Sequence, residues 1–366
     1  MTPTEACIAL NMLPTVGPVR LRKLLQVFKE PQQILAARRA DLRRVEGIGQ
    51  EVADQISNWE LTVDLPAELK LVRDLGATVI TQKSPEYPKP LREIHAPPIE
   101  LYVWGGMQER DNHAIGIIGA RRTTHYGAES AKKLAYQLAY AGLTIISGLA
   151  RGIDTAAHQG ALAAKGRTIA VIGSGLAKLY PPENGALAEK IRDGNGAIVS
   201  EFSMQIEPDR QTFPMRNRII SGWSYGILVV EAGLNSGALI TAAQALEQGR
   251  SVYAVPGHIN APSAMGSNRL IQQGAKLVMD ASDILDDLQI LLPEAKPLPQ
   301  AAARPLPPLS DEERRVYEAI DAAETPIDRI AAKSALPSGA VSSTLLSLEL
   351  KRLVKQLPGK YFVKLG

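Results

Sequence analysis

The pattern of apolar and polar positions changes along the chain and divides it into regions. In residues 4–60 apolar side chains recur at helical spacing, as at Leu21, Leu24 and Phe28. From about Leu65 onwards, short apolar runs alternate with amphipathic stretches of helical period. This change predicts a small all-α domain followed by a domain in which strands and helices alternate.

The apolar runs after residue 63 have the length and composition of buried strands. They span residues 78–81, 100–104, 114–118, 143–147, 168–172, 197–200, 225–230, 251–255 and 276–278. The first two lead into the main sheet, and the later ones alternate with glycine-bearing loops and helices. Strands that are apolar throughout are typical of a parallel sheet covered on both faces. We therefore predict an α/β fold built on an open, doubly wound parallel sheet.

Pro and Ala dominate residues 291–309, and this composition predicts a semi-rigid linker. Beyond it, Ser310 and Glu313 form a capping pattern at the start of a helix. Two further helices and a hairpin with Pro358-Gly359 at its tip complete the pattern of a winged helix. The predicted domains are a helical domain 1–62, a sheet domain 63–290, the linker 291–309 and a winged-helix-like domain 310–366.

Composition narrows the class of protein. The 366-residue chain is 45% hydrophobic, and its first residues lack the basic start and apolar core of a signal peptide, so we expect a cytoplasmic protein with no membrane anchor. Cys7 is the single cysteine and the five histidines are scattered, so we expect no disulfide and no metal site. The net charge of +3 permits nucleic-acid binding, provided that cations cluster locally.

Three of the predicted strands end in loops that combine small residues with a cation. The loops are Gly119 with Arg121 and Arg122, Ser147-Gly148 with Arg151, and Gly173-Ser174-Gly175 with Lys178. The carboxyl ends of the strands of a doubly wound sheet share one rim, so these loops should converge. Glycine lets a phosphate approach the backbone closely, and guanidinium groups offer it bidentate hydrogen bonds.

The segment from Thr212 to Gly257 adds two more elements to this rim. Arg216-Asn217-Arg218 precedes the strand at 225–230 and is predicted to form a turn, and Ser236-Gly237 lies in the loop after that strand. The second loop opens a helix, whose free N–H groups favour an anion. Together the five segments predict a cationic, glycine-floored groove that binds a phosphate or a nucleic acid.

Some residues allow two interpretations. Asp154 and His158 lie four residues apart on one helix face. They could form a metal-binding or acid/base pair, or Asp154 could cap the helix while His158 forms a hydrogen bond. Glu201 and Glu231 at strand ends are either catalytic carboxylates or acceptors that order the loops. The Gly47-Ile48-Gly49 turn also has two interpretations. Its backbone amides could hold a DNA phosphate, as in a helix-hairpin-helix, or its glycines could cap helices of a domain that contacts proteins.

Familiar nucleotide-binding signatures are absent from the sequence. Gly173-x-Gly175-x-x-Lys178 has no third glycine, so the dinucleotide fingerprint fails, and the chain has no P-loop and no G-x-S-x-G elbow. The sequence therefore predicts phosphate binding without an evident catalytic centre.

The order of these motifs resembles the DprA/Smf family. The motifs are Gly119-Ala120-Arg121-Arg122, Ser147-Gly148-Leu149-Ala150-Arg151-Gly152-Ile153-Asp154-x-x-Ala157-His158, Tyr180-Pro181-x-x-Asn184, Phe213-Pro214-x-Arg216-Asn217-Arg218-Ile219-Ile220, Ser236-Gly237-x-x-Ile240-Thr241-Ala242 and Val255-Pro256-Gly257. They span roughly residues 114 to 275, and the flanking helical and winged-helix pieces also resemble the family arrangement. Ala177 departs from the pattern, because many members have Asp ahead of the Tyr-Pro pair.

The resemblance implies an extended Rossmann fold that dimerises through its sheet domain. It implies a cytoplasmic, non-catalytic protein of natural transformation that binds incoming single-stranded DNA, protects it and helps load the RecA recombinase; we expect no cofactor. The residues expected to bind the nucleic acid are Gly119, Arg121, Arg122, Ser147, Gly148, Arg151, Gly152, Lys178, Arg216, Asn217, Arg218, Ser236, Gly237 and Thr241.

Aromatic residues make up 5% of the chain, so few side chains can stack on bases. Phe213, Tyr126, Tyr180 and Trp223 are the candidates in or near the rim loops. In the terminal domain, the helix that opens at 337–344 carries small hydroxyl residues and few cations. Protein contact, or weak duplex contact through the wing, is therefore favoured over sequence-specific reading.

The sequence is also compatible with two functions of other classes. The Ser236-Gly237 loop is similar in position to the phosphate loop of cytokinin-activating phosphoribohydrolases, although the Pro-Gly-Gly-x-Gly-Thr loop and following glutamate of those enzymes are absent. A nucleotide-processing enzyme is thus the alternative, and a transcription regulator acting through the winged helix is a third interpretation.

Overall fold

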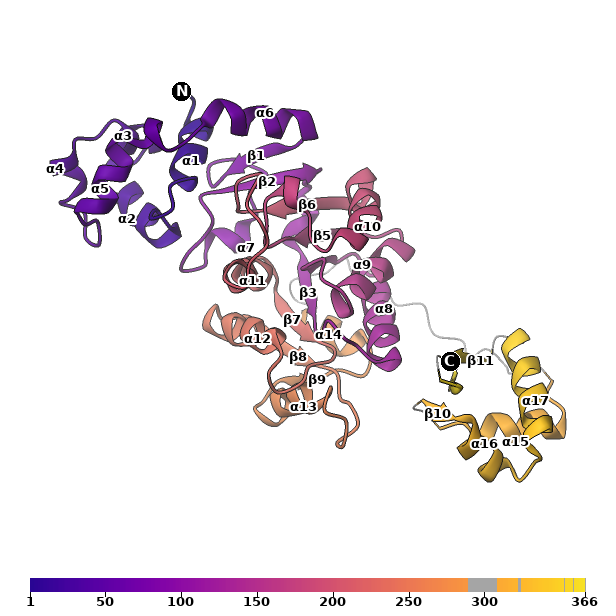
Figure 1. Cartoon of the computed structure of the whole chain (residues 1–366). Coiled ribbons are helices and arrows are strands. Elements are labelled where there is room, and N and C mark those ends of the chain that lie inside the picture. The colour runs from indigo at the N-terminus through magenta and orange to yellow at the C-terminus, as the bar shows by residue number, and fades with distance from the viewer. Residues whose placement is uncertain (289–307, 322–323, 352, 358, 366) are drawn as a thin grey trace. The chain divides into compact units, whose positions relative to one another are not determined.

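The computed structural model of the protein describes residues 1–288, 308–321, 324–351, 353–357 and 359–365 (Figure 1). It divides into two compact units, Met1–Leu298 and Pro299–Gly366. Residues 291–307 of the predicted linker, and Pro358 at the predicted hairpin tip, lie outside the described residues. The division into four parts with boundaries after residues 62, 290 and 309 stays a prediction.

Short helices form the N-terminal region, as its apolar spacing predicts. They are α1 (Pro3–Asn11), α2 (Pro18–Phe28), α3 (Pro31–Leu35), α4 (Arg39–Leu42) and α5 (Gln50–Ser57). Proline opens α1, α2 and α3, where its missing N–H costs no helical hydrogen bond. Between α4 and α5, Gly47 has φ = +82°, a conformation that favours glycine, and the turn leads directly into α5.

A nine-stranded sheet forms the centre of the first unit, in the order β1-β2-β6-β5-β4-β3-β7-β8-β9. The neighbours from β6 to β9 in this order pair in parallel, which confirms the prediction, and β1 and β2 add antiparallel strands at one edge. The carboxyl ends of the parallel strands therefore meet at one edge of the sheet. The bounds are β1 (Thr78–Thr81), β2 (Glu100–Gly105), β3 (Ala114–Ile118), β4 (Thr144–Ser147), β5 (Thr168–Val171), β6 (Gly196–Ser200), β7 (Gly226–Val229), β8 (Ser251–Ala254) and β9 (Lys276–Leu277).

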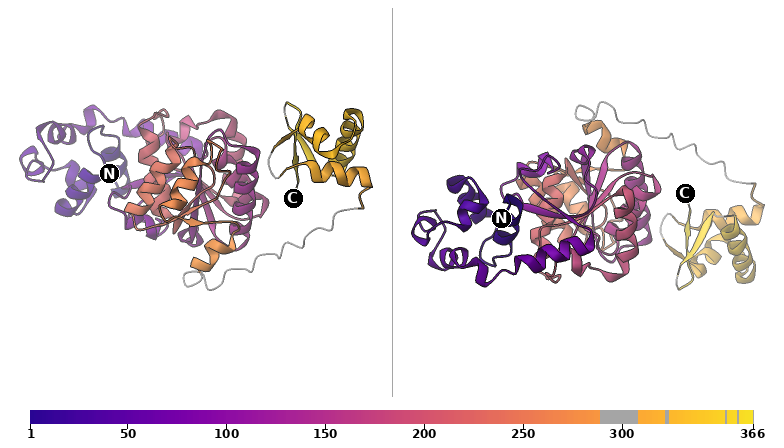
Figure 2. Two further views of the ribbon diagram at one scale, coloured as in Figure 1. Left: turned by 90° about the horizontal axis from the view of Figure 1, so that it is seen from below. Right: turned by 90° about the horizontal axis from the view of Figure 1, so that it is seen from above.

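Helices cover both faces of this sheet (Figure 2). The helices on one face are α7 (Lys89–Arg92), α11 (Thr212–Trp223), α12 (Gly237–Glu247) and α13 (Met265–Gln272). Those on the other face are α6 (Leu65–Leu75), α8 (His125–Tyr140), α9 (Ile153–Ala163), α10 (Gly185–Lys190) and α14 (Ser282–Leu288). The sheet is therefore doubly wound. Among the described residues, no helix combines the length and apolar character needed to cross a membrane.

The predicted turn at Arg216-Asn217-Arg218 is wrong, because these residues lie inside α11. Pro214 falls in the first turn of this helix, where proline is tolerated. Ile219, Ile220 and Trp223 then follow at helical spacing and are buried against the sheet. Because a helix buries all three side chains against the sheet, the segment that contains the arginines is helical and does not form a turn.

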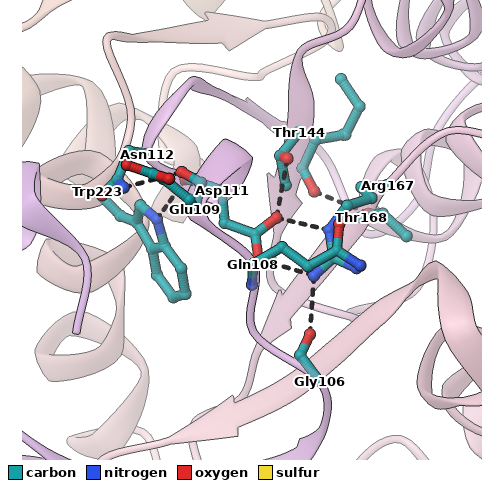
Figure 3. Close-up of polar contacts among 10 residues, drawn as sticks. Gly106, Gln108, Glu109, Asp111, Asn112, Thr144, Arg167, Thr168 and Trp223 are labelled. Atoms are coloured by element: carbon teal, nitrogen blue, oxygen red, sulfur yellow. Dashed lines mark hydrogen bonds and ion pairs between the residues drawn. The ribbon is translucent and has the colours of Figure 1, made fainter. Parts of the chain in front are cut away.

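A buried ion pair closes the opposite, amino-terminal edge of the sheet (Figure 3). Arg167 donates to both carboxylate oxygens of Asp111 at 2.7 Å and to the carbonyl of Gly106 at 2.8 Å. The Thr144 hydroxyl and the Gln108 amide also donate to Asp111, at 3.0 and 2.8 Å. Asp111 and Arg167 thus lock the segment after β2 to the starts of β4 and β5.

The second unit has the winged-helix pattern predicted for it. Its elements are α15 (Asp311–Ala319), β10 (Thr325–Pro326), α16 (Ile327–Ser334), α17 (Ser338–Leu350), β11 (Val354–Leu357) and β12 (Tyr361–Lys364). Ser310 and Glu313 form the predicted capping box of α15. The three helices and the β10-β12-β11 sheet bury a core of their own, which includes Val316, Leu345 and Phe362.

Candidate nucleic-acid interface

A pocket lies at the carboxyl edge of the sheet, where the loops after β3, β4 and β5 meet the first turn of α11. Its lining residues are Arg121, Gly148, Ala150, Arg151, Gly173, Ser174, Tyr180, Pro181 and Phe213. The convergence of these loops, expected from the shared rim of parallel strands, is confirmed. Of the residues predicted to bind nucleic acid, Arg121, Gly148 and Arg151 line this pocket.

Two arginines of the pocket lie over its two aromatic rings. The guanidinium carbon of Arg121 is 4.6 Å from the ring centroid of Phe213, and that of Arg151 is 5.9 Å from Tyr180. The rings of Tyr180 and Phe213 lie 6.2 Å apart with their planes tilted by 50°. Cation–π contacts of this kind help to hold the two guanidinium groups in place at the pocket.

The two arginines differ in their partners. Arg121 is exposed and forms no ion pair with any residue that the structure describes. Arg151 pairs with Glu183, and both side chains are about half exposed, at 53% and 50%. The hydrogen bond with Glu183 raises the pKa of Arg151, and the same bond lowers the pKa of Glu183. A half-exposed pair of this kind is screened by salt, so a phosphate can compete for Arg151.

Glycines allow the loops to approach one another this closely. A Cβ atom on Gly173 would lie 2.9 Å from the ring of Phe213, and one on Gly148 would collide with the guanidinium of Arg216. Gly152 has φ = +77° and packs against the backbone of the loop after β3. Gly119 is confined in the same way, since its Cβ would lie 2.6 Å from Ile153. Gly119 and Gly152 therefore join the loops rather than line the pocket.

Asp154 organises the loop after β4. Its carboxylate accepts hydrogen bonds from the amides of Gly148 at 3.1 Å and Ala150 at 3.3 Å. Burial raises the pKa of Asp154, and the charge of Arg216 opposes that rise. The imidazole of His158 shares a 2.6 Å hydrogen bond with the Thr168 hydroxyl. The hydrogen-bonding role of His158 is thus confirmed, whereas the expected helix cap is wrong, because Asp154 accepts from amides of the loop before α9. No group of three or more metal-ligating side chains occurs among the described residues.

Glu231 organises the loop after β3 in the same manner. Its carboxylate accepts from the hydroxyl of Thr123 at 2.5 Å and from the amide and hydroxyl of Thr124 at 2.9 and 3.2 Å. Its carbonyl accepts from the amide of Ala120 at 2.7 Å. Glu231 is 4% exposed and therefore acts as an acceptor that orders the Arg121 loop.

Arg216 lies beneath the pocket rather than on its rim. It is 4% exposed and donates from Nη1 to the carbonyls of Gly148, at 2.7 Å, and Val171. Burial lowers the pKa of Arg216 to about 10, against the opposing charge of Asp154. Arg216 therefore supports the pocket floor and contributes positive charge below it.

Arg218 is also turned inward. It forms an ion pair with Glu201 in which the two side chains are 13% and 4% exposed. Burial raises the pKa of Glu201, and the charge of Arg218 lowers it. Nη1 of Arg218 and Oε2 of Glu201 have no hydrogen-bond partner within the described part of the chain. Here Glu201 serves as an acceptor for an arginine, one of the two roles left open by the sequence.

The remaining predicted residues do not line the pocket. Ser147 is buried and its hydroxyl donates to Ile117 at 2.6 Å, and Thr241 is 2% exposed within α12. Ser236 caps α12, and Lys178 pairs with Glu207 at 2.7 Å. The others are exposed or partly exposed outside the pocket lining: Arg122, Asn217 and Gly237.

The aromatic candidates separate into two groups. Tyr180 and Phe213 line the pocket, whereas Trp223 is fully buried and donates from its indole nitrogen to the Asp111 carbonyl at the amino edge, 2.7 Å away (Figure 3). Tyr126 is 51% exposed in the first turn of α8. Trp223 was expected near the rim because it follows the arginines in sequence, but the length of α11 carries it to the far edge.

Several of the cations near the N-terminal hairpin are paired within their own region, whereas the exposed Arg43 forms no ion pair with a described residue. Lys23 forms an ion pair with Glu46 at 2.9 Å, and Asp41 accepts from both Arg38 and Arg44. These pairs reduce the charge that the Gly47 turn can offer to a phosphate, so DNA contact there stays one of two interpretations.

Comparisons with known proteins cover nearly the whole chain. Residues 78–289 match the family model of DNA recombination-mediator protein A, residues 300–360 that of the DprA winged helix domain, and residues 8–58 that of a SAM-like helix-hairpin-helix tandem. Protein Smf of Synechocystis is 35% identical over 96% of this chain and 96% of its own length. Protein Smf of Escherichia coli is 40% identical over 77% of this chain and 76% of its own.

Two solved structures share the fold. DNA processing protein A of Streptococcus pneumoniae superposes with a TM-score of 0.70 at 33% identity, covering 78% of this chain and 99% of its own. DNA processing protein A of Helicobacter pylori, described for its single-stranded DNA binding mode, gives a TM-score of 0.53 at 28% identity, covering 59% and 97%. With its central region matched by the family model and its full length by Smf, the chain belongs to the DNA recombination-mediator protein A family, the DprA/Smf family.

Proposed function

We propose that the pocket at the carboxyl edge of the sheet binds single-stranded DNA. The observation that carries this proposal is the position of Arg121 and Arg151, each of which holds its guanidinium over an aromatic ring of the pocket. A guanidinium held in this way can stack one face on a base and direct its N–H groups at a phosphate. Single strands, whose bases are unstacked, can use both contacts at once.

The sequence tolerance of such binding follows from the groups involved. The pocket offers backbone, guanidinium planes and ring faces, all of which contact any base alike. The relative from Helicobacter pylori, described for single-stranded DNA binding, supports the same ligand class for this chain. We therefore expect binding that depends on strandedness and salt more than on sequence.

Membership in the family supports a more detailed proposal for the function. We propose that the chain acts by binding, without catalysis or a cofactor, and that it protects incoming single-stranded DNA and helps load the RecA recombinase during natural transformation in the cytoplasm. The support for this role is its membership in a family of DNA recombination mediators.

We further propose a homodimer through the sheet domain. The support is a pair of exposed apolar side chains at the β9 edge, Leu277 at 41% and Met279 at 78%, together with exposed apolar side chains on α12, Ile240 at 47% and Leu246 at 62%. Several exposed apolar side chains near a short edge strand are typical of a protein contact surface. Light scattering of the wild type and of Met279→Glu would test this, with a shift toward monomer expected in the variant.

The winged-helix unit is a weaker candidate for reading DNA. The sequence of α17 contains no Lys or Arg, and its exposed positions include Ser338, Ser342 and Ser343. A helix that reads the major groove usually brings cations or amides to the base edges. We propose that this unit serves protein contact or weak contact with duplex phosphates.

The decisive experiment measures oligo-dT binding by fluorescence anisotropy across salt concentration. For the double variant Arg121→Ala/Arg151→Ala we expect a loss of affinity of roughly 10- to 100-fold at low salt, because two charged contacts are removed. The salt slope should also fall by about 1.4, at about 0.7 per phosphate contact.

Arg73→Ala is the matched control, because Arg73 is an exposed arginine on α6, away from the pocket lining. It should bind oligo-dT as the wild type does. Equal binding by the double variant, with an unchanged unfolding midpoint, would refute the pocket. Release of free base from nucleoside monophosphates by the wild type would instead favour the nucleotide-processing alternative.

A further inference from the structure

The solvent face of α8 carries an exposed pair of tyrosines. Tyr136 and Tyr140 lie one turn apart, each is 38% exposed, and their ring centroids are 6.4 Å apart with planes 10° from parallel. The other face of α8 packs on the sheet and α9 through small and aliphatic side chains such as Ala131 and Leu134. The two rings are therefore not needed to hold the helix in place.

Cations without carboxylate partners accompany the tyrosines. Lys132 and Lys133, one turn earlier on α8, are exposed and form no ion pair among the described residues, and the same holds for Lys165 just beyond α9. Glu129 is the one acidic residue in the sequence of α8. Asp280 interacts with Lys133 electrostatically without an ion pair. The lysines therefore offer unpaired positive charge beside the tyrosines, although the carboxylates of α14 lie on the same face of the sheet.

The start of α8 adjoins a loop of the candidate pocket. The loop that carries Arg121 and the exposed Arg122 leads directly into Thr124, which caps α8 by accepting a hydrogen bond from the Gly127 amide at 3.1 Å. Glu231 fixes the same loop from below. Helix α8 begins at the carboxyl edge and runs back along the sheet beside α9 (Figure 1). Its 16 residues rise about 24 Å, the reach of several nucleotides.

We propose that the exposed face of α8 is a second contact surface for the same single strand, in which Tyr136 and Tyr140 stack on bases and Lys132 and Lys133 contact phosphates. The inference rests on the proposed function of the pocket, and it extends the DNA path beyond it. Stacking on exposed aromatic rings beside a cationic track is the common design of sequence-tolerant single-strand binding. The free lysines argue for a polyanion as the occupant of this face.

The test compares a short oligo-dT of about six nucleotides, which binds at the rim around the pocket, with one of about 25 nucleotides, which also extends along α8. For Tyr136→Ala/Tyr140→Ala we expect unchanged affinity for the short oligomer and a loss of about ten-fold or more for the long one. For Lys132→Gln/Lys133→Gln we expect the salt slope of the long oligomer to fall by about 1.4.

Matched controls separate this effect from general surface change. Tyr361→Ala removes a tyrosine of similar exposure, 40%, in the second unit, and Lys190→Gln removes an exposed lysine of α10. Both should leave the binding of either oligomer unchanged. A loss of long-oligomer affinity as large in Tyr361→Ala as in the α8 variant would overturn the inference.

The outcomes also distinguish the two proposals. If Arg121→Ala weakens both oligomers while the tyrosine variant binds both as the wild type does, the α8 surface is refuted and the pocket stands. If the wild type binds neither oligomer, both proposals fail. If the tyrosine variant changes the oligomeric state without changing long-oligomer binding, the face serves a second copy of the chain and the inference is overturned.

A direct readout uses photo-crosslinking of a long oligomer with bromodeoxyuridine at single positions. We expect adducts on the peptide that contains Tyr136 and Tyr140 when the modified base lies several nucleotides from the end held by the pocket. Adducts confined to the peptides of Tyr180 and Phe213 at every position would contradict the proposed path.

Discussion

The two edges of the central sheet hold buried arginines in contrasting ways. At the amino edge, Arg167 and Asp111 are 5% and 2% exposed at their side chains, and each carboxylate oxygen and two guanidinium nitrogens have partners (Figure 3). At the carboxyl edge, Arg216 and the Arg218–Glu201 pair leave polar atoms without a hydrogen-bond partner in the described structure. These are Nε of Arg216, Nη1 of Arg218 and Oε2 of Glu201.

The difference shows what each edge is built for. A bidentate pair in which both carboxylate oxygens and two guanidinium nitrogens have partners contributes a fixed geometry and offers little to a ligand. Buried polar atoms without partners cost free energy, and native proteins tolerate them mainly where function requires it. Arg216 contacts Gly148 of the pocket lining, so the carboxyl edge retains hydrogen-bonding capacity and positive charge beneath the place where the DNA is proposed to bind.

The largest effect that tests this comparison is expected at the amino edge. Asp111→Ala leaves the Arg167 guanidinium buried without its carboxylate, which should destabilise the first unit by about 3–5 kcal/mol. The double variant Asp111→Leu/Arg167→Met removes both charges and should recover much of that loss. Chemical denaturation measures both values.

The affinity of the folded variants for a short oligo-dT of about six nucleotides is the control for the amino edge. It should match the wild type, because this edge is separated from the pocket by the length of the strands. If a fully folded variant bound oligo-dT less tightly than the wild type, the two edges would not be independent. The contrast drawn between them would then be wrong.

A smaller effect is expected from Glu100, which opens β2 beside the carboxyl end of β6. Glu100 is fully buried, and its carboxylate has only weak contacts with the side chains of Asn11 and Tyr102, without a hydrogen bond of good geometry among the described residues. Burial raises the pKa of Glu100 well above its usual value, and the charges of Glu68 and Glu201 add to the rise. A raised pKa means that this carboxyl stabilises the fold at low pH, and that the stability is lost as pH rises through the folded-state pKa.

Glu100→Gln should therefore be more stable than the wild type at about pH 8, by about 1–3 kcal/mol, because the amide carries no charge to bury. The advantage should shrink toward zero near about pH 4, where the carboxyl is protonated in both folded and unfolded chains. Unfolding midpoints across this pH range measure the difference. A wild type that gains stability relative to the variant as pH rises would contradict the assignment.

Much of the fold could be predicted from sequence because it depends on local patterns. Apolar runs between glycine loops fix the strands of a doubly wound sheet, and the carboxyl ends of parallel strands share an edge by topology alone. That argument brings Arg121, Gly148 and Arg151 together, and all three line the pocket. Tyr180 could be found by the same reasoning, since it lies in a loop of the same rim, and Phe213 lies in the first turn of α11 beside it.

The rest depends on contacts between distant segments. The burial of Arg216 follows from its carbonyl partners Gly148 and Val171, which belong to other strands, and no local pattern signals it. The Arg218–Glu201 and Arg167–Asp111 pairs are likewise tertiary. Charge in a sequence therefore predicts which rim is cationic, but not which cations face solvent.

The smallest expected effect comes from Glu183, which pairs with Arg151 at the pocket. Both side chains are about half exposed, so their pair is weak and competes with a phosphate for the same guanidinium. Glu183→Gln should free Arg151 and remove a negative charge, raising the affinity for oligo-dT by up to about five-fold at low salt and less at high salt. The matched control is Glu207→Gln, because Glu207 pairs with Lys178, which does not line the pocket. If Glu207→Gln raises affinity as much as Glu183→Gln does, the gain reflects overall charge, and Arg151 has no special place in the site.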